Sequence, residues 1–286
     1  MLKNSLLPYI VPYMLVNGAT NFVSSKLSEK KIISNFHNFE FDKPFIDKNN
    51  IIIPDELKKY VEVLEKNICK ENLSNLYNNI TDVEVNKQPL LVLMGIKGKY
   101  DSEKNTLEYA QKSSIGHELL HLASSYHDKD KNITLSGFIN YDKDFKYGKA
   151  LNEGYTDLLA RKLFNDKVSF YNEEVRIIKF LELLLNKDEL QKYYFNNDLY
   201  GFIKRLETYM NKEDSIKFVL NFDLGFSLKK QANPLYKAVY TNLELQLCDL
   251  FKKHNKSLLK QIDYLKLLDE SFITDKIQTV KQKIKH

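Results

Sequence analysis

The stretch HELLHLASSYHD, residues 117–128, predicts both a local fold and a chemistry. His117 and His121 are four residues apart, so on an α-helix they lie about 40° apart around the axis and share one face. Two imidazoles in this arrangement can bind one ion, and Zn²⁺ suits them because it takes neutral imidazole nitrogens at about 2.0–2.1 Å. Glu118 projects beside the pair, where it can accept a proton from a metal-activated water as general base.

The other face of the same stretch carries apolar residues. They repeat at steps of four, three and four, which is typical of a helix that packs one side on a hydrophobic core: Ile115, Leu119, Leu122 and Tyr126. We therefore expect a helix that is anchored by its apolar face and directs its histidines across a cleft.

One candidate for the third metal ligand is His127, at the end of the stretch. With it, the sequence resembles the HExxHxxGxxH pattern of the metzincins, but Ser124 stands where that family has glycine. A serine there must adopt a positive φ, or the helix continues and carries His127 away from the metal. Metzincins also have a methionine turn, and the only downstream methionine, Met210, lies in a stretch with a helical pattern. Both departures disfavour His127.

The other candidate lies in GKALNEGYTDLLARKLF, residues 148–164. Glu153 and Asp157 are four residues apart and share one helical face. A glutamate on a helix opposite the two histidines completes the His2Glu set of catalytic zinc enzymes. The segment resembles the gluzincins: NEGYTD matches the asparagine-glutamate pair and following aspartate of thermolysin-like peptidases, and LNEG is similar to the glutamate helix of the M1 aminopeptidases.

This resemblance implies a zincin-like peptidase with one catalytic Zn²⁺ and a peptide or protein substrate. It implies Glu153 as third ligand, Asp157 as the partner of His117, Asn152 as a supporting polar residue and Glu118 as general base. The reaction would be amide hydrolysis without a covalent intermediate.

The resemblance covers residues 117–157, and its two motifs are further apart than in thermolysin. We expect the intervening residues 128–149 to form a loop or a hairpin that lines the cleft.

The group that stabilises the oxyanion has no clear match. Only His254 and His286 follow Glu153, and neither resembles the histidine of thermolysin-like enzymes. A tyrosine, as in M1 enzymes, is the expected alternative, with Tyr171 first and Tyr141 and Tyr155 behind it. The GxMEN sequence of M1 enzymes is absent, which favours an endopeptidase. The missing oxyanion group also motivates the alternative of a binding or regulatory protein that keeps the metal site without turnover.

The remaining pattern predicts an α+β protein. We expect a helix over residues 54–80, two strands or a hairpin over residues 89–110, and helices after residue 149. The segment 105–110 is the expected edge strand for an extended substrate. The predicted organisation is an N-terminal, mainly helical region (residues 1–84) and a zincin-like domain (residues 85–286) that has a small mixed sheet, the HExxH helix and a mostly helical C-terminal half.

Composition restricts the classes of function. The net charge is +5, but 43 basic and 38 acidic residues are mixed along the chain, which disfavours a nucleic-acid partner. The two cysteines, Cys69 and Cys248, predict no disulfide framework. Residues 1–19 form a candidate hydrophobic leader that is too short to span a bilayer. We expect a cytoplasmic location, with secretion or membrane attachment as alternatives, and the sequence predicts no oligomeric state.

Overall fold

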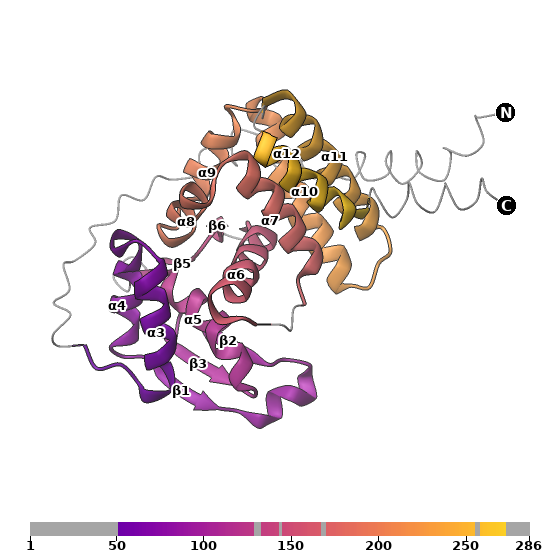
Figure 1. The fold of residues 1–286 in the computed structure, drawn as a ribbon. Coiled ribbons are helices and arrows are strands. Elements are labelled where there is room, and N and C mark those ends of the chain that lie inside the picture. Colours follow the sequence, from indigo (N-terminus) through magenta and orange to yellow (C-terminus); the bar gives the residue numbers. More distant parts are fainter. Residues whose placement is uncertain (1–50, 129–132, 143–144, 167–169, 255–257, 273–286) are drawn as a thin grey trace, which may run out of the picture.

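The computed structural model describes residues 51–128, 133–142, 145–166, 170–254 and 258–272, and the expected leader at 1–19 lies outside them. The described residues form a mainly helical α+β structure with small sheets, which confirms the predicted class (Figure 1). In this part of the chain, no helix is long and apolar enough to cross a membrane.

The largest sheet has three short strands in the order β1-β3-β2. Strand β1 (Glu84–Lys87) is parallel to β3 (Thr106–Tyr109), and β2 (Gly98–Asp101) is antiparallel to β3. The expected hairpin is therefore present as β2 and β3. The expected edge strand is wrong, because β3 is the central strand and β2 lies at the edge.

Residues 89–94 were expected to be part of a strand and are instead the 3₁₀-helix η3 (Pro89–Met94). The backbone reverses at Gly95, whose φ of 71° is left-handed and whose N–H donates back to the carbonyls of Leu91 and Val92. The apolar run matched a buried strand in composition, but every one of its residues is exposed or only partly buried.

The motif helix is α5 (Ile115–Ala123), which follows the short η4 (Lys112–Ser114). Its expected apolar face is buried through Ile115, Leu119 and Leu122. Tyr126 is not on the helix, because the chain leaves it at Ser124 with φ −103° and ψ 6°. The expectation that serine needs a positive φ to end this helix is therefore wrong.

The segment between the two motifs forms two hairpins. Strands β4 (Ser125–Asp128) and β5 (Ile133–Ser136) pair antiparallel, as do β6 (Asn140–Asp142) and β7 (Phe145–Tyr147). The expectation of a hairpin over residues 128–149 is confirmed for the described residues.

The helix expected over residues 54–80 is interrupted. It consists of α3 (Asp55–Asn67), η2 (Lys70–Leu73) and α4 (Ser74–Ile80), because Ile68 adopts an extended conformation with φ −114°. Asn79 ties α4 to the end of the motif helix, since its side-chain amide donates to the carbonyls of Leu122 (2.9 Å) and Ser125 (2.7 Å). The described N-terminal helices thus share one hydrophobic core with α5.

The C-terminal half is helical, as expected. Its helices are α6 (Lys149–Phe164), α7 (Asn172–Leu184), α8 (Lys187–Phe195), α9 (Leu199–Leu206), α10 (Lys212–Lys230), α11 (Tyr236–His254) and α12 (Leu258–Asp269). Helix α6 packs against α5, α7 and α10. Its start is held by Asp223 on α10, whose carboxylate accepts the N–H groups of Gly148 (2.7 Å) and Ala150 (2.8 Å).

This contact predicts a pH dependence of stability. Burial raises the pKa of the partly exposed Asp223 from 3.8 to about 6, although the N–H groups of Ala150 and Gly148 lower it. Because the folded pKa is the higher one, the stabilisation is complete below about pH 4 and is lost as pH rises through about 6. As pH rises from about 4 to above 6, the ionisation of Asp223 should lower the unfolding free energy of the wild type by no more than about 3 kcal/mol, and by less where solvent screens the charge. Asp223→Asn should not show this fall, because asparagine does not ionise.

Urea unfolding at pH 4 and pH 7.5, followed by circular dichroism, measures this effect. The unfolding free energy of the wild type should fall more between the two pH values than that of Asp223→Asn. An equal fall in both proteins would contradict the role assigned to this carboxylate.

Candidate metal centre

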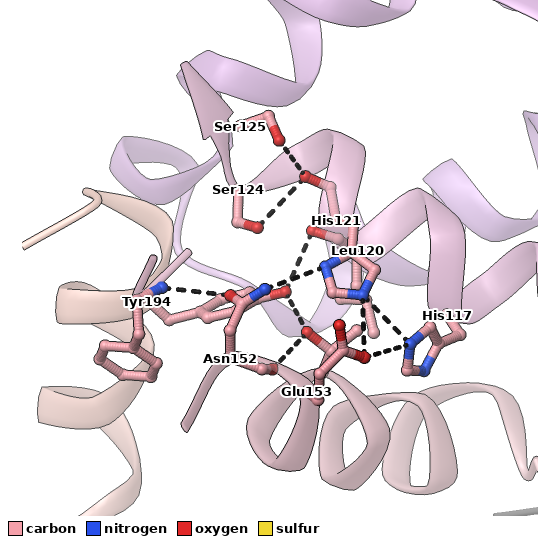
Figure 2. A network of polar contacts seen from close by, with 10 residues as sticks. His117, Leu120, His121, Ser124, Ser125, Asn152, Glu153 and Tyr194 are labelled. Carbon is pink, nitrogen blue, oxygen red and sulfur yellow. Dashed lines mark hydrogen bonds and ion pairs between the residues drawn. The ribbon is translucent and has the colours of Figure 1, made fainter. Parts of the chain in front are cut away.

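The histidines of α5 and the glutamate of α6 converge on one point. Nε2 of His117 lies 3.1 Å from Nε2 of His121, and the two nitrogens lie 3.6 and 3.7 Å from Oε2 of Glu153. Figure 2 shows the Glu153 carboxylate facing both imidazole rings. Among the described residues, these three form the only group of histidine, cysteine and acidic side chains close enough to hold one metal ion.

The spacing of these three atoms fits a small tetrahedral ion. Bonds of about 2.0–2.1 Å in a tetrahedral site separate neighbouring ligand atoms by about 3.3–3.4 Å. The observed distances of 3.1, 3.6 and 3.7 Å scatter around that value. Two imidazoles and one carboxylate also leave a fourth position for water or substrate, as in catalytic zinc sites.

The three side chains are only slightly exposed, and their charges are strongly coupled. Burial lowers the pKa of His117, but the hydrogen bond with Glu153 and the charge of Glu118 outweigh it and raise the pKa to about 9. Burial raises the pKa of Glu153, but the charge of His121 and the hydrogen bonds with both histidines lower it well below its usual value. Without a metal, Glu153 is therefore ionised and paired with a protonated His117, which has to release its proton when a cation binds.

Glu118 is buried beside the triad, under the edge strand. Burial raises the pKa of its carboxyl group, although the histidine charges and the backbone N–H of Tyr100 on β2 lower it. The strand approaches closely because Gly98 has no side chain: a Cβ there would lie 2.9 Å from Cγ of Glu118 and 2.5 Å from Oγ of Ser114.

Asn152 lies where it can orient His121. Its side-chain amide is 3.3 Å from Nδ1 of His121, on the opposite side of the ring from the nitrogen that faces Glu153. The same amide accepts the backbone N–H of Phe138 at 3.1 Å, which fixes it from the hairpin side.

Asp157 lies one turn further along α6. It forms an ion pair with Arg161 at 2.9 Å, and its charge contributes to the raised pKa of His117. The side chain is therefore close enough to act on His117 electrostatically while Arg161 compensates its charge.

Of the three tyrosines expected as oxyanion groups, the structure brings Tyr171 to the site. It directly precedes α7, its ring stacks on His117 with centroids 6.0 Å apart, and its hydroxyl hydrogen-bonds with Glu153. Burial and the charge of Glu153 raise the pKa of this hydroxyl. Tyr155 is instead buried in the core against Phe138, and the side chain of Tyr141 lies outside the described residues.

His127 lies apart from the triad. It belongs to strand β4, and its Nδ1 is 2.8 Å from Oγ1 of Thr134 on β5. Because β4 and β5 pair in a hairpin, the His127 side chain contacts Thr134 and does not join the three residues of the triad.

The triad opens into two hollows of about 190 and 520 Å³ that share His117, Glu118 and Tyr171. Sequence reasoning missed several of the residues that line them, namely Ile96, Gly98, Tyr100, Ser114, Lys146 and Lys230. Gly98, which lies a short distance before the motif in the sequence, was a signal that a strand passes close to the motif helix. Lys230, at the end of a distant helix, carried none.

Comparisons with protein-family models, with curated proteins and with solved structures find no match to this chain. We therefore infer its function from the geometry of the site.

The contact of Asn152 predicts an effect on metal affinity. Residues that hydrogen-bond to the second ring nitrogen of a metal-binding histidine typically strengthen metal binding by about 10–100-fold. We therefore expect Asn152→Ala to weaken Zn²⁺ binding by about that factor. Competition with a chromophoric chelator measures it. As a control, Thr134→Val removes the contact of His127 and should leave the affinity unchanged. Equal affinities in wild type and Asn152→Ala would show that Asn152 does not support the site.

Proposed function

We propose that this protein is a zinc-dependent peptidase of the gluzincin type, with a zincin-like fold and endopeptidase activity. The observation that carries the proposal is the convergence of His117, His121 and Glu153 from two packed helices, with Glu118 buried beside them. The donor set of two imidazoles and one carboxylate, with a glutamate next to it, is the one used by metal-dependent hydrolases such as thermolysin.

Glu118 is suited to move a proton. A bound Zn²⁺ would supply Lewis acidity, polarising the scissile carbonyl and lowering the pKa of a water toward about 7. Because burial raises the pKa of Glu118, its carboxylate can accept a proton and pass it to the leaving amine. The N–H of Tyr100 holds this carboxylate in place from the edge strand.

The edge strand β2 is where an extended substrate would bind. It pairs with β3 on one side, and residues Gly98–Glu103 line the larger hollow next to the triad. A peptide could add to this edge through backbone hydrogen bonds. Both hollows are lined by His117 and Glu118, so the space next to the triad extends beyond the metal ligands, as a substrate cleaved within its chain requires.

Tyr171 is suited to stabilise the oxyanion. Its raised pKa keeps the hydroxyl protonated, so the group can donate a hydrogen bond to a developing negative charge. Its hydroxyl hydrogen-bonds with Glu153 and its ring stacks on His117, so the group lies against two of the three residues of the triad. Tyr171 is thus our candidate for the oxyanion-stabilising group, for which the sequence has no histidine that resembles that of thermolysin-like enzymes.

The test is hydrolysis of an unstructured protein such as casein by the zinc-loaded protein. We expect Glu118→Gln to lower kcat/KM by about 10²–10⁴-fold while keeping its zinc, because the variant loses the general base and no ligand. The matched control is Glu108→Gln on β3, outside the site, which should cleave like the wild type. Equal turnover by wild type and Glu118→Gln would exclude the proposed mechanism, and no turnover by either would favour a binding role.

A further inference from the structure

The 3₁₀-helix η3 presents an unusual apolar surface. Its residues are Pro89, Leu90, Leu91, Val92, Leu93 and Met94, and four of them are largely exposed, with exposed fractions of 70% for Leu90, 52% for Val92, 83% for Leu93 and 72% for Met94. Figure 1 shows this loop between β1 and β2 extending away from the helices. Large apolar side chains that are clustered and exposed in this way mark an interaction site.

The apolar tip is ordered by its own backbone. The N–H of Gly95 donates to the carbonyl of Val92, and the N–H of Ile96 donates to the carbonyl of Leu91. The base of the loop is fixed to the sheet, since Gln88 donates to Tyr109. The tip is therefore a rigid projection, and little conformational entropy opposes its insertion into another phase.

The charged residues closest to the tip in the sequence are lysines, whereas Glu84 and Asp101 lie further from it and Asp101 forms an ion pair with Lys99 at 3.3 Å. Residues 85–100 contain three lysines, Lys87, Lys97 and Lys99, and no aspartate or glutamate, although acidic residues number 38 in the whole chain. Lysines beside an exposed apolar tip match the surface of a bilayer that contains anionic lipids, where each lysine is attracted to the head groups.

We propose that η3 inserts into the surface of an anionic lipid bilayer, with Lys87 and Lys97 at the level of the head groups. A convex tip with side chains exposed on several sides fits a deformable acyl phase better than the flat interior of a protein interface. The proposal is independent of the proposed peptidase activity. It also places the candidate metal centre close to the membrane, because Ile96 and Gly98, just after the tip, line the hollows around His117.

The chain has no tryptophan, so a single introduced one reports on its own surroundings. In full-length Leu93→Trp, we expect the emission to shift to shorter wavelength with vesicles of phosphatidylcholine and phosphatidylserine, and to be quenched by brominated lipid. Vesicles of phosphatidylcholine alone should bind more weakly, by about fivefold for each lysine at the head groups. The matched control is Leu245→Trp on α11, where the exposed fraction is 47%; its emission should not change.

The substitutions are at exposed positions and should leave the fold intact. Unchanged emission of Leu93→Trp in the presence of anionic vesicles would overturn the proposal, even if the protein sediments with them through another segment. A shift that occurs without vesicles and grows with protein concentration would also overturn it, because a second copy of the chain would then cover the tip.

Discussion

The arrangement of the site depends on the packing of α5 against α6. Two imidazoles and a carboxylate are costly to bring together away from water, and they remain there only if their helices are held firmly by other contacts. Leu119 and Leu122 anchor α5 in the core, and Asp223 on α10 holds the start of α6. The helical C-terminal half thus supports the site by fixing the first turn of α6, the helix that carries the candidate ligand Glu153.

Much of the fold could be predicted where short-range periodicity decides the structure. The buried face of α5, the hairpin of β2 and β3 and the helices after residue 149 follow from local patterns. The errors occur where long-range contacts decide. The apolar run of residues 89–94 has the composition of a buried strand, but β1 pairs with β3, and the run is left outside the sheet. The same pairing makes β2 the edge strand.

The sequence also predicted part of the candidate site, namely the pair of histidines and the glutamate that faces them. The steps of four that put His117 beside His121 can be read from the sequence, and the gluzincin resemblance pointed to Glu153. The end of α5 at Ser124 was predicted wrongly because the backbone can leave a helix with negative φ when the next residues enter a hairpin. Tyr171 was named from the tyrosine of M1 enzymes and not from its spacing. The approach of Lys230 depends on how α10 packs, which residue spacing does not reveal.

The most direct measurement is the zinc content of wild type, Glu153→Ala and His127→Ala, loaded with zinc and dialysed. We expect about one ion per chain in wild type and in His127→Ala, and loss of zinc in Glu153→Ala, because the proposed third ligand is the carboxylate of Glu153. Zinc retained by Glu153→Ala and lost by His127→Ala, or a wild type that holds none, would contradict it.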